Sequence, residues 1–201
     1  MAGEGGRPRL MVVAGPNGSG KTTITERGLA HTWFAGCEYI NPDNIARDDF
    51  GGWNDPASVL AAANAAQARR ESCLAQGRSL AFETVFSGAD KPEFIRLCRR
   101  AGFFCRLFFV GTSDPTINAA RVAKRVMNGG HDVPIAKIIA RYFKSVANCA
   151  EVAVDVDRLY VYDNSVDDAP PRLLFRAANG RAVRAYADVP PWAAAIMARL
   201  R

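Results

Sequence analysis

The eight residues GPNGSGKT at 15–22 match the pattern G-x-x-x-x-G-K-[ST] at every fixed position. They follow LMVVA at 10–14, an apolar run typical of a strand buried on both faces, and precede KTTITERGLAH, which can form a helix. This strand–turn–helix context is the one in which the pattern binds phosphate groups. It makes a chance match in a surface turn the weaker interpretation, and it favours an α/β fold with a phosphate-binding loop.

Each residue type in this loop has a chemical reason to be there. Glycines let the backbone wrap closely around phosphate with its N–H groups pointing inward, and the following helix presents the positive end of its dipole. Lys21 can place a charge near the β- and γ-phosphates of ATP or GTP, and the Thr22 hydroxyl is suited to Mg²⁺. The predicted nucleotide-binding residues are Gly15, Pro16, Asn17, Gly18, Ser19, Gly20, Lys21, Thr22 and Thr23.

Short apolar runs predict further strands at 37–40, 79–82, 104–110 and 158–163. Helical segments alternate with them: one is capped by Asp55 and ends at Gly77, another follows Asp114 and stops at 128–130, and Pro134 opens the next. This alternation predicts the P-loop NTPase/kinase fold, an α/β fold with a mainly parallel five-stranded sheet flanked by helices.

The chain divides by composition into three parts. Residues 1–9 are predicted to form a flexible leader, and residues 10–165 the P-loop core, with a lid region at about 115–134. In residues 166–201, RLLFRA and RAVRAYA flank Asn179-Gly180, a dipeptide that suits a tight hairpin turn, and Pro190-Pro191 precedes a short helix. This small C-terminal β-hairpin and helix are expected to be appended to the same domain.

The overall composition is that of a globular, cytoplasmic protein. The 201 residues are 49% hydrophobic and 23% charged, with no apolar run of about 18 residues to cross a membrane and no apolar signal segment in MAGEGGRPR. The five cysteines are scattered without a C-x-x-C pair, which predicts free thiols. The formal charge of +6 favours anionic partners such as phosphates or nucleic acid, without choosing between them.

Polar residues follow several predicted strands, where ligands of a parallel sheet gather. Asp43 follows the second strand and can accept the proton of an attacking hydroxyl; alternatively it caps the helix that begins at Asn44. Glu83 and Thr84 end the third strand. Three interpretations of Glu83 remain: it is partly buried beside Lys21 and Mg²⁺, it binds hydroxyl groups of the substrate, or it is a strand-end charge exposed to solvent. Asp163 ends the fifth strand, as a structural turn or as a contact on the adenine side.

Arg121 and Arg125 are spaced i and i+4, which places both on one face of a helix. A solvated basic face is one interpretation. The other is a mobile helix that closes on the transferred phosphate, with Arg141 joining from the next helix, because cations stabilise the charge of the transition state. His131, in the glycine loop between them, is expected to order that loop.

The assembled motifs resemble those of the zeta-toxin family of P-loop kinases, in particular its short stand-alone bacterial members. The matching pieces cover roughly residues 10–165 and are AGPNGSGKTT, INPDNIA, AFETVFSG, RVAKRVMNGGHDVP, ARYFKSVAN and VYDNS, in that order. The resemblance implies a kinase that uses ATP and Mg²⁺ to phosphorylate a hydroxyl, the N-acetylglucosamine 3′-hydroxyl of UDP-N-acetylglucosamine in the best-understood members, and an antitoxin protein as partner.

By the same resemblance, Asp43 would be the catalytic base, Lys21 the phosphate-binding lysine and Glu83 the residue that holds the sugar. Basic residues among Arg121, Arg125 and Arg141 would clamp the phosphates. Two other hypotheses keep the phosphate-binding loop. One is a kinase that acts on another metabolite or on a nucleic-acid 5′-hydroxyl. Nucleic acid is the less favoured partner, because the aromatic residues mostly lie in apolar runs and a nucleic-acid groove needs exposed aromatic rings for stacking. The other is a nucleotide-dependent switch without phosphoryl transfer.

Overall fold

The computed structural model describes residues 6–51, 55–127 and 133–201. The strands are β1 (Arg9–Ala14), β2 (Glu38–Ile40), β3 (Leu80–Thr84), β4 (Phe104–Gly111), β5 (Arg158–Asp163), β6 (Arg172–Ala178) and β7 (Arg181–Ala185). The helices are α1 (Lys21–Leu29), the 3₁₀ helix η1 (Thr32–Phe34), α2 (Pro42–Asp49), α3 (Pro56–Ala75), α4 (Asp90–Arg100), α5 (Pro115–Met127), α6 (Ile135–Val152) and α7 (Pro191–Met197).

The described strands form one seven-stranded sheet in the order β2-β3-β1-β4-β5-β6-β7. The first five strands of this order pair in parallel, and β6 and β7 continue the sheet in antiparallel fashion from β5. The predicted α/β fold class is thereby confirmed. The C-terminal hairpin is present, with Asn179 and Gly180 both at positive φ in its turn. It widens the main sheet instead of forming a separate layer.

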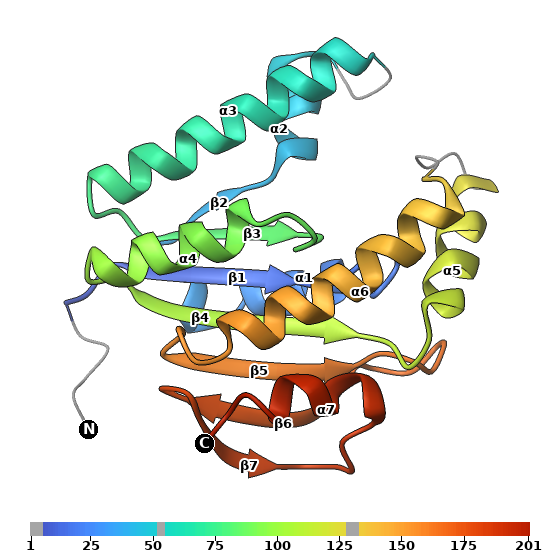
Figure 1. Ribbon diagram of the computed structural model, residues 1–201. Coiled ribbons are helices and arrows are strands. Elements are labelled where there is room, and N and C mark those ends of the chain that lie inside the picture. The colour runs from blue at the N-terminus through green and yellow to red at the C-terminus, as the bar shows by residue number, and fades with distance from the viewer. Residues whose placement is uncertain (1–5, 52–54, 128–132) are drawn as a thin grey trace.

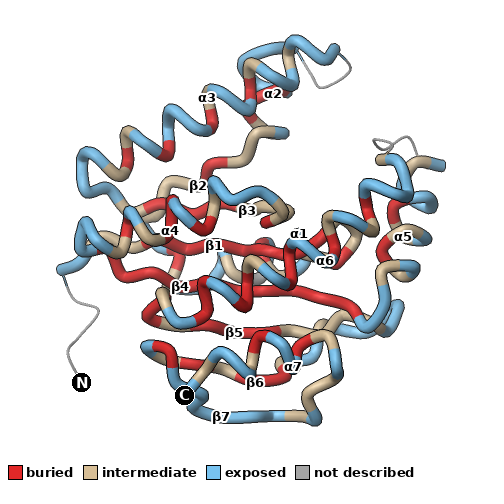
Figure 2. The backbone as a smooth tube through the Cα atoms, viewed as in Figure 1, coloured by how far each residue is buried: buried red, intermediate tan, exposed pale blue. Residues whose placement is uncertain are grey.

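Helices cover the two faces of the sheet unequally (Figure 1). On one face, which we call the α6 face, helices α2, α3, α4, α6 and α7 bury the larger core, built on residues such as Leu10, Phe82 and Leu107. On the other, the α1 face, Ile24 of α1 and the two rings of η1 pack over a smaller core that includes Met11. The central strands are therefore buried on both sides, as Figure 2 shows in red.

Local capping explains where several elements begin. Asp55 caps α3 as predicted, because its Oδ2 accepts from the backbone N–H of Ser58 at 3.0 Å. Asp114 accepts from the N–H of Thr116 at 2.7 Å at the start of α5. The predicted helix stop at 128–130 and His131 lie outside the described residues. No helix in the described ranges is long and apolar enough to span a membrane.

Candidate active site

The glycine-rich loop lies at the carboxyl ends of the parallel strands. The N–H of Gly15 donates to the carbonyl of Thr84, at the end of the neighbouring strand β3, over 3.2 Å. The N–H of Ser19 donates to the carbonyl of Pro16 within the loop, over 3.3 Å. The loop therefore lies at the sheet edge where parallel α/β proteins bind ligands.

Two glycines are required because other chain segments approach the loop closely. Gly18 has φ 74°, and a Cβ there would lie 2.6 Å from the carbonyl oxygen of Asn118 in α5. Gly20 has φ 88°, and its missing Cβ would overlap the Asn164 side-chain amide. A residue with a side chain at either position would be strained in its backbone and would displace its neighbour.

Amide side chains from two other elements hold the carbonyl groups of the loop. Asn118, fully buried in α5, donates from Nδ2 to the carbonyl of Asn17 over 2.6 Å. Asn164, just after β5, donates from Nδ2 to the carbonyl of Ser19 over 2.8 Å. Two carbonyl oxygens of the loop are thus bonded to side chains from α5 and from the segment after β5, which holds the loop in its conformation.

Lys21 begins α1 and its ammonium is held by its own loop. Nζ donates to the carbonyl of Pro16 over 2.9 Å. Burial lowers the pKa of Lys21 to about 8; the negative charge of Glu83 opposes this shift, and the positive charge of Arg125 adds to it. Glu83 and Arg125 therefore act electrostatically on Lys21, although neither bonds to it directly.

The start of α1 fits Mg²⁺ together with a nucleotide. Thr22 is exposed on the first turn, directly after the left-handed Gly20 that precedes the helix. No group of three or more His, Cys, Asp or Glu side chains in the described ranges could hold a metal ion. A hydroxyl with few protein partners still suits Mg²⁺, which usually keeps several waters and binds through substrate phosphates and one or two protein ligands.

A hydrogen-bonded group at the ends of β2 and β3 lies next to this lysine. The Tyr39 hydroxyl donates to Oε1 of Glu83 over 3.1 Å and accepts from Nδ2 of Asn41 over 3.1 Å. Burial raises the pKa of Tyr39, and the charges of Glu83 and Asp43 raise it further. Tyr39 and Asn41, which were not among the predicted site residues, thus connect Glu83 to the start of α2.

Asp43 is exposed and does not cap α2. The cap is Asn41, whose Oδ1 accepts from the N–H of Asp43 over 2.8 Å, while Pro42 occupies the first turn. The alternative that Asp43 is a helix cap is therefore wrong. Its carboxylate is left available in the first turn of the helix.

The three predicted arginines have different surroundings. Arg121 is partly buried: it forms an ion pair with Asp167 at 2.6 Å, and its Nη1 donates to the carbonyl of Asn164 over 2.7 Å. Arg141 donates from Nη1 to Oδ1 of Asn17 in the phosphate loop over 3.2 Å. Arg125 is exposed, one turn after Arg121.

Helix α6 contributes residues that the sequence interpretation missed. The Tyr142 hydroxyl donates to the carbonyl of Thr112 over 2.7 Å, and Ser145 donates to the carbonyl of Val85. Asn148 donates from Nδ2 to the carbonyl of Phe86 over 2.8 Å. These residues repeat every three positions in ARYFKSVAN, and this polar spacing on an otherwise apolar helix face is the signal that could have identified them.

The segment after Glu83 is fixed in an unusual conformation. Phe86 is buried at φ 63°, a region that side chains rarely adopt, and its N–H donates to Oγ1 of Thr84 over 3.1 Å. Thr84 therefore shapes this turn. Its carbonyl is bonded to Gly15, so the turn is tied to the phosphate loop.

Asp163 stabilises the turn that follows β5. Its Oδ1 accepts from the N–H of Ser165 over 3.0 Å, and Arg172 lies 3.4 Å from its Oδ2. A pocket of about 260 Å³ opens beside this turn, lined by Asp163, Asn164, Ser165, Val166, Ala169, Pro170 and Arg172. Since Asn164 also holds the phosphate loop, the pocket adjoins the site.

Comparison with known proteins identifies the domain type. A family model described as an AAA domain matches residues 10–144, which is more than half of the chain. No curated protein sequence matches the chain.

Several solved structures share the fold. A chain from the PezAT chromosomal toxin–antitoxin system of Streptococcus pneumoniae has a TM-score of 0.62 and 14% identity, and the match covers 85% of this chain and 72% of that one. A chain of the AvrRxo1-ORF1:-ORF2 complex with ATP has a TM-score of 0.67 and 16% identity, with 90% and 61% covered. A chain of the Pnkp1/Rnl/Hen1 RNA repair complex has a TM-score of 0.57 and 14% identity, with 72% and 46% covered.

At such identities the likeness shows the fold alone. The protein spans about three fifths of the AvrRxo1 chain it matches. Together with the loop geometry, these matches identify an α/β P-loop fold.

Proposed function

The chain belongs to the AAA-domain family whose model it matches, and on that premise we propose that it is a cytoplasmic, ATP- and Mg²⁺-dependent kinase of zeta-toxin type. The acceptor we propose is a hydroxyl of a nucleotide sugar, with UDP-N-acetylglucosamine as the first candidate. An antitoxin protein is the proposed partner.

In the proposed reaction, Asp43 accepts the proton of the acceptor hydroxyl. The hydroxyl oxygen attacks the γ-phosphorus of ATP, and the bond from that phosphorus to the bridging oxygen breaks, which releases ADP. Lys21, the loop N–H groups, Arg125 and Arg141 stabilise the negative charge on the transferred group. Mg²⁺, held by Thr22 and the phosphates, would neutralise charge on the β- and γ-oxygens.

Arg121 has a positioning role in this proposal. Its guanidinium donates to the carbonyl of Asn164 and to the carboxylate of Asp167. It therefore fixes the segment after β5, from which Asn164 bonds to the loop. Arg125 remains the exposed cation whose field reaches Lys21. Of the two arginines on α5, we therefore assign phosphate contact to Arg125.

A second pocket lies between α3 and α4, and charged side chains of both signs line it. It encloses about 210 Å³ and is lined by Gln67, Arg70, Glu71, Leu74, Asp90, Lys91, Glu93, Phe94 and Leu97. Arg70 is 6% exposed, and its guanidinium stacks over Phe82 at 5.3 Å. Burial lowers the pKa of Arg70, and the negative charges of Asp90 and Glu71 oppose this shift, so carboxylates of the chain itself already partly balance this guanidinium.

The observation that carries the proposal is that charged and polar groups from five elements, α1, β2, α2, β3 and α5, lie close enough at one sheet edge to influence one another. The charges of Glu83 and Arg125 shift the pKa of Lys21, and the charges of Glu83 and Asp43 raise the pKa of Tyr39. A phosphate-binding lysine, a carboxylate for the acceptor and an exposed candidate base at one edge are the groups that phosphoryl transfer to a hydroxyl requires.

The test is direct phosphorylation of defined acceptors. Protein, ATP and Mg²⁺ are incubated with UDP-N-acetylglucosamine, other nucleotide sugars and nucleosides, and the products are identified by mass spectrometry. We expect one nucleotide sugar to gain a phosphoryl group, and Asp43→Asn to lower the rate by a factor on the order of 10² to 10⁴.

Asp48→Asn is the matched control, because Asp48 is an exposed carboxylate on the same helix, bonded to Arg47. Asp48→Asn should leave turnover unchanged. If only an acceptor of another class is phosphorylated, the proposal that the acceptor is a nucleotide sugar is wrong. If no acceptor is phosphorylated, the proposal that the protein is a kinase is wrong.

A further inference from the structure

Within the described ranges, the α1 face of the sheet is left without a helix over β6 and β7. The helical residues that pack on this face come from α1, which lies behind the sheet in Figure 1, and from η1, whose rings contact Phe108 on β4. Trp33 of η1 reaches as far as Tyr160 on β5, with ring centroids 5.6 Å apart. Beyond it, the described structure places no helix against β6 and β7 on this side, and every residue of β7 is exposed.

The strand register places a row of aromatic and basic side chains across this face. Phe108 on β4 pairs with Tyr160 on β5, and their rings stack at 5.1 Å. Tyr160 pairs with Arg176 on β6, and Arg176 pairs with Arg184 on β7. Directly paired residues lie on one face of a sheet, so the side chains of Arg176 and Arg184 leave neighbouring strands on the same face.

Two further residues extend the row. Arg158 lies two positions before Tyr160 on β5 and therefore shares its face. Tyr186 is 43% exposed, and the guanidinium of Arg184 lies 4.8 Å from its ring. We name Arg158, Arg176, Arg184 and Tyr186 the arginine face.

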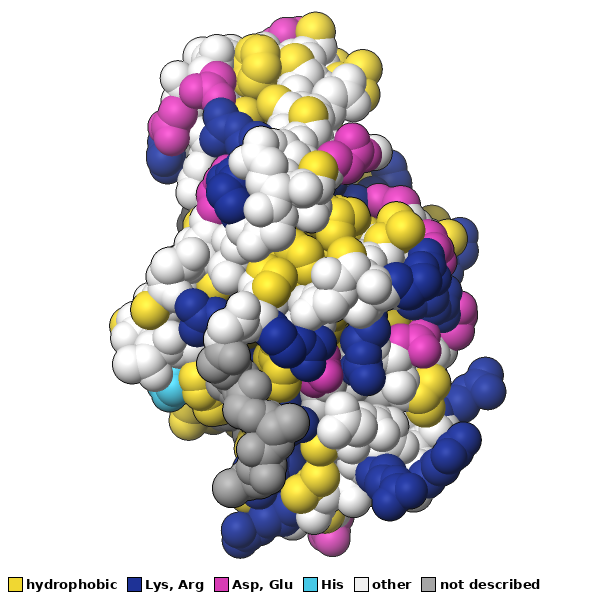
Figure 3. Space-filling view, turned by 90° about the vertical axis from the view of Figure 1, so that its left-hand side faces the viewer, with side chains coloured by type: hydrophobic (Ala, Val, Ile, Leu, Met, Phe, Trp, Pro, Cys, Tyr) yellow, Lys and Arg dark blue, Asp and Glu magenta, His cyan; other side chains and the backbone are white. Residues whose placement is uncertain are grey.

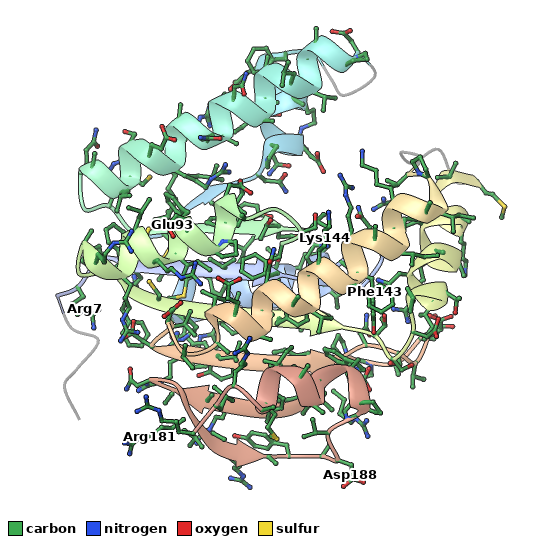
Figure 4. The ribbon with its side chains drawn as sticks, in the orientation of Figure 1. Arg7, Glu93, Phe143, Lys144, Arg181 and Asp188 are labelled. Atoms are coloured by element: carbon green, nitrogen blue, oxygen red, sulfur yellow. The ribbon has the colours of Figure 1, made fainter. Side chains whose placement is uncertain are left out.

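The positive charge of the arginine face is not balanced locally. In the described ranges none of its arginines forms an ion pair, and Nε of Arg176 is buried without a hydrogen-bond partner. Residues 172–201 contain six arginines and one aspartate. Figure 3 shows Lys and Arg side chains gathered over the lower part of the molecule, where β6 and β7 lie, and Arg181 points away from the sheet in Figure 4.

Like charges directly opposite on neighbouring strands destabilise a sheet, so the pair Arg176–Arg184 weakens the fold unless an anion lies between the two groups. We propose that the arginine face binds single-stranded nucleic acid. Guanidinium groups match phosphate geometry better than ammonium groups do, and the exposed ring of Tyr186 offers a stacking surface for a base. This surface is separate from the phosphate loop, and its role does not depend on the proposed kinase activity.

The charge count sets the expected salt dependence. Three arginines that neutralise three phosphates of a single strand give a slope of about −2 for log affinity against log salt concentration. Affinity should therefore fall by roughly twentyfold between 50 and 200 mM salt. Tyr186→Ala should cost roughly fivefold or more, the loss expected when one stacked base is released.

The experiment is fluorescence anisotropy with an end-labelled oligothymidylate of about 15 nucleotides, in the presence of excess MgATP to occupy the phosphate loop. The variant Arg158→Ala/Arg176→Ala/Arg184→Ala is compared with Arg47→Ala/Arg69→Ala/Arg78→Ala. The control removes the same charge from exposed arginines outside this face, each paired with a carboxylate. We expect a tenfold or greater loss for the first triple variant and less than threefold for the second.

Thermal unfolding of both triple variants confirms that each is folded under the assay conditions. Absence of binding by the wild type at 50 mM salt would overturn the proposal, as would equal losses in the two triple variants. Polyglutamate or anionic vesicles that displace the oligonucleotide at matched charge concentration would also overturn it, because the surface would then bind any polyanion.

Discussion

Replacement of Lys21 by methionine should stabilise the protein in the absence of nucleotide. The pKa of Lys21 is lowered from 10.5 to about 8, chiefly by burial, so the folded state carries its charge at a cost of roughly 3 kcal/mol at neutral pH. The variant loses the bond from Nζ to Pro16, worth about 1.5 kcal/mol. The difference, about 1.5 kcal/mol, corresponds to a melting temperature higher by roughly 3–6 °C in a chain of this size.

The assay is thermal unfolding by circular dichroism at pH 7, with and without MgATP. Wild-type protein should melt at a higher temperature when MgATP is present, whereas Lys21→Met should gain little, because the lysine that we propose to contact the phosphates is missing. Lys144→Met is the control: Lys144 is exposed on α6 (Figure 4), and its loss should change neither temperature.

The pH dependence gives a second readout for the same residue. Between pH 8 and 10.5 the unfolded chain holds a proton on Lys21 that the folded chain has released, so stability attributable to this group rises with pH in that window. The advantage of Lys21→Met should therefore shrink through this window, reach zero where the cost of the charge has fallen to about 1.5 kcal/mol, and become a disadvantage above about pH 10.5, where only the loss of the bond to Pro16 remains. A variant that melts several degrees below the wild type at pH 7, or equal gains from MgATP in both proteins, would refute the reasoning.

Three other substitutions separate structural from chemical roles. Arg121→Ala should lower the free energy of unfolding by about 1–2 kcal/mol, whereas Arg125→Ala should lower kcat without lowering the melting temperature; the reverse pattern in denaturation and rate assays would contradict these assignments. Tyr39→Phe removes the hydrogen bond to Glu83 and should raise KM for the acceptor more than for ATP, measured by steady-state kinetics. Gly18→Ala should weaken ATP binding at least tenfold by calorimetry, and unchanged affinity would show that the loop tolerates a side chain.

The sheet was largely predictable because its strands are buried on both faces. The apolar run at 104–110 became β4, Phe104–Gly111, in which every residue is buried. The turn residues Asn179 and Gly180 likewise indicated the hairpin correctly. The local sequence pattern could not predict that β6 pairs with β5, because this pairing depends on the packing of the whole chain.

The cap of α2 could have been assigned from sequence. Proline is favoured in the first helical turn because it has no N–H to leave unpaired, so Pro42 indicates that the preceding Asn41 is the cap. The partners of Arg121 could not have been assigned from sequence, because Asp167 is 46 positions away and reaches α5 only in the folded chain. For the same reason η1 was missed, because its rings are placed by contacts with Phe108 and Tyr160.

Mass spectrometry of a metabolite extract incubated with the protein, Mg²⁺ and ATP labelled in its γ-phosphoryl group tests the central claim most directly. The proposed function predicts that one small molecule acquires the labelled group, that the product is a nucleotide sugar, and that Asp43→Asn abolishes its formation while MgATP still raises the melting temperature of that variant. Label recovered only as inorganic phosphate, or a labelled product formed equally by Asp43→Asn, would contradict it.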